Sequence, residues 1–205
     1  MKKFELFCIL FILFVYNNYI KEDWSFITKI GKIYYCKIFY GNGTAKIVKK
    51  SPWKDISDGV ISDLGSHLLD TVNFWFNYNY RNFKMAKFKK FENNSSDYMN
   101  LIYQNKSLFI ELEATLCMWK NTFRCEIVGS KGSLSIDSLC KWGPSKFIYR
   151  KRKYPSGIPK ETCLTLQIKD PTWKKEYLHF KKLIKNKSYD NFRSDKIIRK
   201  IIRNL

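Results

Sequence analysis

The sequence is poor in the residues that most often carry metal and nucleophile chemistry. Its 205 residues hold only two histidines, His67 and His179. The six cysteines form no C-x-x-C pair, so neither a zinc site nor a disulfide framework is indicated. Because they lie in apolar or strand-like surroundings, we expect reduced, mostly buried thiols. The cysteines are Cys8, Cys36, Cys117, Cys125, Cys140 and Cys163.

Chain breakers and long apolar runs are also scarce. With nine glycines and five prolines, no Gly- or Pro-rich linker divides the chain, and no internal repeat is visible. A length of 205 residues suits one domain with at most a small appendage. The run of residues 6–16 is too short for a membrane-spanning helix, which needs about 20 residues. The length therefore excludes a large multi-domain enzyme.

The apolar N-terminus leaves two interpretations open. Residues 1–3, Met-Lys-Lys, precede the apolar run as in a secretory signal, but Glu5 interrupts it and no small-x-small cleavage site follows. We therefore expect an apolar N-terminal segment over 1–19 that forms a buried element, with a signal or anchor as the alternative. The remainder, 20–205, is expected to form one domain. A cytoplasmic location follows, unless residues 4–16 associate with a membrane.

Acidic residues are few. Against 18 Asp and Glu there are 38 Lys and Arg, which gives a net charge of +20. Such a charge attracts nucleic acid, anionic membrane surfaces or phosphorylated small molecules, and it bears on association rather than fold. The richness in Lys, Asn, Ile, Tyr and Phe is equally typical of AT-rich coding. Hydrophobic residues at 45% and aromatic residues at 17% indicate a globular chain rather than a disordered one.

Residue patterns along the chain predict an α+β fold. A short helix over 20–30, a loop over 44–58, and later helices over 172–186 and 194–205 are expected. Strand-type composition, separated by short polar turns, favours antiparallel neighbours. The expected strands are 32–40, 80–91, 98–104, 107–118, 121–128, 133–137 and 162–168. Together these elements predict a largely antiparallel open β-sheet with helices on one face.

The clearest helix is predicted from Gly59 to about Tyr78. At 100° per residue, its large apolar side chains fall on one stripe that would face the core. That stripe consists of Val60, Leu64, Leu68, Val72 and Trp75. A neighbouring face carries Asp63, His67 and Asp70.

Asp63 and His67 form the most chemically suggestive pair. A four-residue spacing puts the carboxylate one turn before the imidazole, within mutual reach. A carboxylate there favours the protonated imidazole and can orient it while it exchanges a proton with a substrate. The plain alternative is a histidine that is ion-paired on a helix surface, since D-x-x-x-H alone is a weak signal.

Six segments, in order along the chain, sharpen this interpretation. They are "GKIYYCKIFYGNGTA", "SPWKD", "GVISDLGSHLLDTVNFWF", "KKFENNSSDYM", "EIVGSKGSLSI" and "WKKEYLHFKKLIK". Over about residues 9–203 the chain resembles the C-terminal domain of the Gfo/Idh/MocA family of NAD(P)-dependent oxidoreductases. The D-L-G-S-H-x-x-D stretch is the most specific part of the resemblance. The fold it implies is an open sheet like that of the C-terminal domain of dihydrodipicolinate reductase.

The resemblance implies a function and site residues. His67 matches the histidine that accepts a substrate hydroxyl proton during hydride transfer, and Asp63 matches the acid that assists it. Trp53 and Asp70 would lie near a sugar, cyclitol or nucleotide-sugar substrate. NAD or NADP is the implied cofactor, and self-association through the open sheet face is usual in the family. A near-neutral pKa suits histidine to such a proton transfer.

Departures from the family pattern concern the cofactor. Neither a Gly-rich Rossmann turn nor the E-K-P segment with its catalytic lysine is found. "GNGTAK" at 41–46 is not G-x-G-x-x-G and opens no convincing helix. Residues 9–16 resemble the last Rossmann strand, so the chain resembles a member without its cofactor domain. We expect a truncated or split oxidoreductase, with a partner chain supplying that domain, or a non-catalytic remnant that binds a sugar or oligomerises.

A basic nucleic-acid or membrane-surface binder is the remaining alternative. Residues 82–91 and 147–154 interleave basic and aromatic side chains, as single-strand nucleic-acid surfaces do, but a strand with one wet face gives the same pattern. No RNP, KH or zinc-finger signature supports nucleic-acid binding. The terminal residues 196–205 could lie on a membrane, although packing against the domain is favoured. His179 is expected to be a partly buried structural histidine. We therefore expect neither nucleic acid nor membrane as a partner.

Overall fold

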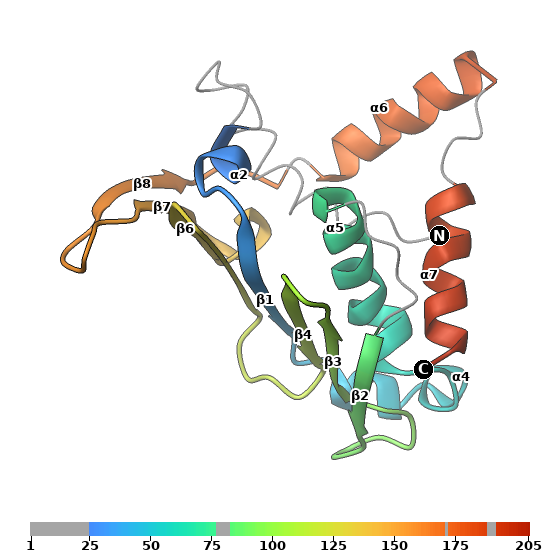
Figure 1. Cartoon of the computed structure of the whole chain (residues 1–205). Coiled ribbons are helices and arrows are strands. Elements are labelled where there is room, and N and C mark those ends of the chain that lie inside the picture. Colours follow the sequence, from blue (N-terminus) through green and yellow to red (C-terminus); the bar gives the residue numbers. More distant parts are fainter. Residues whose placement is uncertain (1–24, 77–82, 171, 188–191) are drawn as a thin grey trace.

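An eight-stranded mixed sheet organises the chain (Figure 1). The computed structural model describes residues 25–76, 83–170, 172–187 and 192–205, so the expected segment 1–19 and Cys8 lie outside the described residues. In spatial order the strands are β2 (Phe83–Lys89), β3 (Tyr98–Gln104), β4 (Phe109–Thr115), β1 (Ile33–Gly41), β5 (Thr122–Gly129), β6 (Gly132–Asp137), β7 (Ser145–Lys151) and β8 (Lys160–Leu166).

Strand β1 lies inside the sheet and joins its two halves. It pairs in parallel with β4, with Cys36 opposite Ile110, and antiparallel with β5, with Cys36 opposite Ile127. The remaining neighbours in the described sheet are antiparallel. Alternate residues of the central strands are buried, which is the pattern of a sheet with one covered face. The expected α+β fold with a largely antiparallel open sheet is confirmed.

Helices gather against one face of this sheet. The helical elements are α2 (Ser25–Lys29), α3 (Ala45–Lys49), α4 (Pro52–Asp55), the π-helical turn η1 (Ile61–Gly65), α5 (Ser66–Phe76), the 3₁₀ turn η3 (Cys140–Trp142), α6 (Thr172–Lys185) and α7 (Phe192–Arg203). Turn η1 packs against β4, and α5 lies between the sheet and α7 (Figure 1). Among the described residues, no helix is both long and apolar enough to cross a membrane.

The core lies between α5 and the sheet. The predicted stripe on the long helix is confirmed, because all five of its side chains are buried. Across from it lie side chains from β3 and β4, including Met99, Leu101 and Leu112, which are fully buried. Burying large apolar side chains in this way is the main source of folding free energy. The sheet and the helix therefore stabilise each other.

Two segments differ from expectation. Residues 44–58, expected as a loop, form α3 and α4, which are only five and four residues long, and helices so short leave little periodic pattern in a sequence. Strand β7 was absent from the expected strands, although its alternation of basic and aromatic residues had suggested a strand with one wet face. Its burial pattern shows that alternation.

Gly59 connects α4 to η1 at a point where no side chain fits. Its φ of +64° lies in the left-handed region, and a Cβ atom there would be 2.2 Å from the Ser96 carbonyl oxygen. That same oxygen accepts a 2.7 Å hydrogen bond from the Val60 N–H. The approach of two backbone segments thus fixes where the long helix begins.

We expect Gly59→Ala to lower the free energy of unfolding by about 2–4 kcal/mol, because it adds both left-handed strain and a backbone clash. Gly143→Ala separates these two effects. Gly143 also has a positive φ, +126°, but a Cβ atom there would meet nothing within 4 Å. Gly143→Ala should lower the free energy of unfolding by only about 1–2 kcal/mol, which is the cost of backbone strain alone. Urea unfolding measures both values, and equal losses would show that the Ser96 backbone yields to the added methyl group.

Candidate functional site

The candidate residues lie on one continuous helical segment that begins with a π-helical turn. Asp63 is in η1, whereas His67 and Asp70 are in α5. The Ser66 hydroxyl donates to the carbonyl oxygens of Ser62 at 2.9 Å and Asp63 at 3.1 Å. A π-turn inserts one residue into the helical repeat and is frequent at functional sites. Here the π-turn itself carries Asp63, and α5, which carries His67, follows it directly.

His67 is deeply buried. Its exposed fraction is 4%, whereas Asp63 and Asp70 are half-buried. The Thr71 hydroxyl donates a 2.7 Å hydrogen bond to the His67 carbonyl oxygen, which bonds the two residues across one turn. An ion-paired histidine on an exposed helix surface therefore does not describe this side chain. Along the helical segment, this buried side chain lies between two half-buried carboxyl residues, Asp63 and Asp70.

Gly65, two residues before His67, permits close packing between the helical segment and β3. A Cβ atom at residue 65 would be 2.7 Å from the sulfur of Met99 and 3.2 Å from Cγ1 of Ile61. A larger residue at position 65 would therefore require the Met99 side chain of β3 to shift. The histidine is thus positioned by direct helix-to-sheet contact rather than by a loop.

Trp53 lies apart from the three helical residues, on α4. Its side chain is 69% exposed, and the Lys54 ammonium lies 5.2 Å from its ring centroid. The neighbouring Asp55 is buried and anchors α4 to the loop before β3. An exposed aromatic ring next to a cation can stack on a sugar-like ligand, as its sequence position had suggested, and α4 provides a fixed base for it.

Asp55 and Asp97 hold that loop in place. Asp55 accepts hydrogen bonds from Asn94 N–H at 2.7 Å, Asn94 Nδ2 at 2.8 Å and Ser95 N–H at 3.1 Å. Asp97 accepts from the backbone N–H groups of Phe91, Glu92 and Asn93. Burial raises the pKa of the Asp55 carboxyl, but hydrogen bonds from Ser95 and Asn94 outweigh it and leave the pKa below its ordinary value.

This lowered pKa predicts a pH dependence of stability. A carboxyl with a folded-state pKa below its unfolded value stabilises the fold at higher pH, and loses this contribution as pH falls below about 4. We expect Asp55→Asn to be less stable than the wild type at pH 6 and to lose less stability between pH 6 and pH 3. Urea unfolding at both pH values measures this.

Asp58→Asn serves as the control because it removes the same charge from an exposed residue of the same segment. If Asp55→Asn and the wild type lose equal stability on acidification, the hydrogen bonds to Asp55 do not favour its charged form.

A hollow of about 470 Å³ lies on the opposite, open face of the sheet. It is lined mainly by charged and polar side chains of β1, β4, β5 and β6, among them Lys37, Glu111, Glu113, Arg124, Glu126 and Asp137. None of the four sequence-predicted site residues lines it. The structure therefore contains two separate surfaces of interest, the helix that carries His67 and the charged sheet face.

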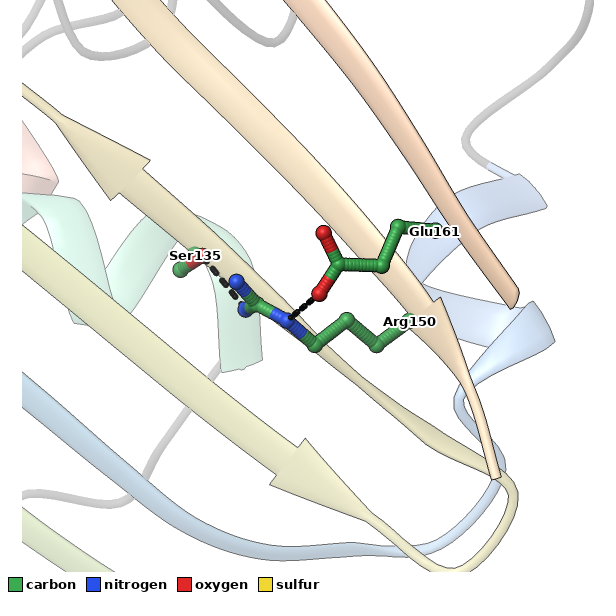
Figure 2. Close-up of polar contacts among 3 residues, drawn as sticks. All are labelled: Ser135, Arg150 and Glu161. Carbon is green, nitrogen blue, oxygen red and sulfur yellow. Dashed lines mark hydrogen bonds and ion pairs between the residues drawn. The ribbon is translucent and has the colours of Figure 1, made fainter. Parts of the chain in front are cut away.

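Polar contacts across the strands order this open face. The Arg150 guanidinium donates to the Ser135 hydroxyl at 3.0 Å and to the Glu161 carboxylate at 2.5 Å, which links β6, β7 and β8 (Figure 2). Lys37 lies 3.5 Å from Glu111. None of these residues is among the sequence-predicted site residues, although Arg150 lies in the basic and aromatic stretch 147–154. Their signal is the alternation of charged and apolar residues along strands such as "FIELEAT", which places every second side chain on the same face.

Two thiols, those of Cys117 and Cys125, are held in their protonated form. Burial, together with the charges of Asp97 and Glu92, raises the pKa of the Cys117 thiol to about 11. Burial, followed by a hydrogen bond with Cys36, raises the pKa of Cys125. Both effects disfavour the reactive thiolate. The described residues also contain no group of three or more His, Cys, Asp or Glu residues that could hold a metal ion.

These features are those of the C-terminal α/β domain of an oxidoreductase family. The sequence model described as "Oxidoreductase family, C-terminal alpha/beta domain" matches residues 27–182, well over half of the chain. The chain therefore belongs to the Gfo/Idh/MocA oxidoreductase family. Among curated proteins no match was found.

Solved structures share the fold at low sequence identity. A protein assigned as an NADPH-dependent oxidoreductase from Desulfitobacterium hafniense is 14% identical, with a TM-score of 0.63 over 85% of this chain and 53% of its own. An oxidoreductase from Agrobacterium radiobacter with NAD⁺, L-tartaric acid and magnesium is 13% identical, with a TM-score of 0.57 over 84% and 53%. Levoglucosan dehydrogenase with NADH is 15% identical, with a TM-score of 0.53 over 76% and 43%. The chain thus spans about half the length of these proteins.

The family implies a nicotinamide cofactor, and the described residues do not fit one. The glycines nearest to a dinucleotide motif are Gly41 and Gly43, at the end of β1. A Cβ atom at Gly41 would be 2.3 Å from Cγ of Met118, and one at Gly43 would be 2.6 Å from the Met118 carbonyl oxygen. The space above these glycines is therefore filled by the chain itself and is not available to a pyrophosphate. The helix that follows, α3, has only five residues.

Proposed function

We propose that this chain is the substrate-binding, proton-accepting half of an oxidoreductase that acts on a hydroxyl of a sugar, cyclitol or nucleotide-sugar. His67 would accept the hydroxyl proton, and Asp63 would orient and charge-stabilise the imidazole. Trp53 and Asp70 would contact the substrate through ring stacking and hydrogen bonding. The observation that carries this proposal is the burial of His67 at the start of α5, directly after the π-helical turn that carries Asp63.

The nicotinamide cofactor belongs to a part outside the described fold. NAD or NADP would be held by a Rossmann domain, either in a partner chain or elsewhere, since the described residues leave no space for a pyrophosphate at Gly41 and Gly43. Supporting this division, the solved relatives with NAD⁺ or NADH are about twice as long as the matched region. A cytoplasmic location suits such an enzyme and is proposed with it.

A non-catalytic domain that binds a sugar-like ligand is the second candidate. The observation that favours it is the same filled glycine turn, because a proton acceptor alone cannot oxidise a hydroxyl. The two candidates share the ligand-binding step and differ in the cofactor. An experiment on ligand binding therefore tests what they share, and a nicotinamide titration separates them.

We expect a polyol ligand to perturb the imidazole signals of His67 in the proton NMR spectrum of the full chain. The two histidines give few imidazole signals, and His179→Gln assigns them. Titration with levoglucosan, L-sorbose, L-tartaric acid and myo-inositol should shift the His67 signals with at least one ligand. His67→Gln should weaken that ligand's binding about tenfold, as expected for one lost hydrogen bond to a potentially charged group.

His179→Gln is the matched control and should leave the affinity unchanged, because residue 179 lies on α6. If no ligand of the panel shifts His67, or if His67→Gln binds as tightly as the wild type, His67 is not part of a substrate site. In parallel, NADH emission should show no saturable change with the chain alone. A saturable change would contradict the proposal that the cofactor is held elsewhere.

The open sheet face is proposed as a self-association surface. Charges of opposite sign alternate from strand to strand along one row of this face, where Arg124 is opposite Asp137 and Asp137 is opposite Lys146. A second copy related by a two-fold axis can place its acidic positions against the basic positions of the first. This local balance of charge contrasts with the net +20 of the whole chain.

We expect the double substitution Arg124→Glu with Lys146→Glu to raise the dimer dissociation constant at least about tenfold, because it places like charges opposite each other. Sedimentation equilibrium of the full chain measures this constant. Arg199→Glu with Lys200→Glu, on exposed positions of α7, changes the net charge equally and should leave the constant unchanged. Equal effects of the two pairs would show that the substitutions do not act through this row of charges, and a chain that is monomeric at all concentrations would refute the proposed interface.

A further inference from the structure

The two C-terminal helices have similar composition but different surroundings. Both α6 and α7 alternate basic and apolar residues at helical spacing. The apolar side of α7 packs against α5, with Ile198 and Ile201 buried, so the favoured interpretation of the chain terminus is confirmed. The α6 helix instead extends away from the sheet and α5 (Figure 1), and its large apolar side chains remain exposed.

Four of these side chains form a single stripe along α6. Trp173, Tyr177, Phe180 and Ile184 are separated by four, three and four residues, which places them within about 60° of arc over about 16 Å of helix. Their exposed fractions are 70%, 62%, 56% and 61%. A monomeric protein rarely exposes a contiguous apolar patch of this kind without a binding function. We name these four residues the α6 stripe.

Three lysines lie along one side of the α6 stripe. They are Lys174, Lys181 and Lys185, at about 70° to 110° from its centre, and all three are exposed. Lys181 also lies 5.5 Å from the ring centroid of Tyr177. Long lysine side chains can extend their charge past an apolar surface while their methylene groups contact it. Glu176 is the only acidic residue in the helix, so α6 presents an apolar strip with a positive border.

We infer that α6 binds the surface of an anionic phospholipid membrane through the α6 stripe. An interfacial helix needs aromatic and aliphatic side chains on one side, lysines beside them, and low overall hydrophobicity. Charge complementarity favours this occupant over a second α6 stripe, because the lysines beside two facing stripes would repel each other, whereas anionic headgroups attract them. Because α6 projects from the domain (Figure 1), its stripe can also lie along a flat surface such as a membrane.

The test is sedimentation of the full chain with sucrose-loaded vesicles. Vesicles of phosphatidylcholine with about 30% phosphatidylserine should bind the chain, and pure phosphatidylcholine should bind it at least about tenfold more weakly, since each lysine near an anionic surface adds attraction. Trp173→Ser with Phe180→Ser should lower the partition coefficient at least about tenfold. Both residues are more than half exposed, so these variants should fold, which circular dichroism verifies.

Two matched controls distinguish binding through the α6 stripe from general effects of lost hydrophobicity and lost charge. Leu178→Ser changes an apolar residue of the same helix that is 53% exposed but lies about 140° from the stripe, and it should leave binding unchanged. Lys174→Gln, Lys181→Gln and Lys185→Gln together should weaken binding more than Lys46→Gln, Lys49→Gln and Lys50→Gln. The second set removes the same charge from α3 and the residue after it, where all three lysines are exposed.

Three outcomes would overturn the inference. If the stripe variant sediments with vesicles like the wild type, α6 does not bind the membrane. If deletion of residues 1–19 abolishes binding while the stripe variant retains it, the apolar N-terminal segment is the membrane contact. If the stripe variant converts a dimer to a monomer in sedimentation equilibrium without changing vesicle binding, a second copy covers the stripe.

Discussion

The packing of the long helical segment against the sheet is the contact on which the rest of the structure depends. At its start, Gly65 lies against the Met99 side chain of β3 and η1 packs against β4, and the apolar stripe of the helix is buried. A side chain at residue 65 would displace the end of the Met99 side chain from this packed layer. Because His67 follows two residues later, the packing that forms the core also determines where the candidate base lies.

A second constraint fixes the start of the same helix. Buried Asp55 and Asp97 use their carboxylate oxygens to hold backbone N–H groups of residues 91–95, and Ser96 then accepts a hydrogen bond from Val60. Charged acceptors satisfy several N–H donors at once, which makes an irregular loop rigid. Trp53 is placed by this arrangement because it precedes Asp55 on α4. The exposed ring and the buried histidine are therefore both anchored by β3 and the loop before it.

Much of the fold and part of the site follow from the sequence. The stripe from Val60 to Trp75 predicts a buried helix because its spacing is regular over four turns, and alternation within "YMNLIYQ" and "TFRCEIVG" predicts half-buried strands. The spacing also predicts that Asp63 and His67 share a helix. It does not predict that Asp63 lies in a π-turn, because a single inserted residue leaves the apolar pattern intact. The depth at which His67 is buried depends on Gly65 and Met99, which are distant in sequence.

Other features are set by contacts that no local pattern encodes. The helices α3 and α4 are too short for periodicity, and they depend on Leu116 and Asp55 contacts made across the fold. The parallel pairing of β1 with β4 connects residues about 74 positions apart, which alternation alone cannot specify. The charged hollow on the open face arises only when β1, β4, β5 and β6 are aligned in register.

The positive charge of the chain is unevenly distributed, and this distribution bears on function. On the open sheet face, acidic and basic residues alternate and balance one another, whereas α6 carries lysines beside an apolar stripe. Composition alone could not distinguish these surfaces, since AT-rich coding and selection for anionic partners both raise the lysine content. The clustering of residues distinguishes the two surfaces. AT-rich coding scatters lysines over all exposed positions, whereas a binding surface also needs exposed apolar side chains beside its lysines. Among the described elements, α6 meets that condition, and α7, with the same composition, does not because its isoleucines are already buried against α5.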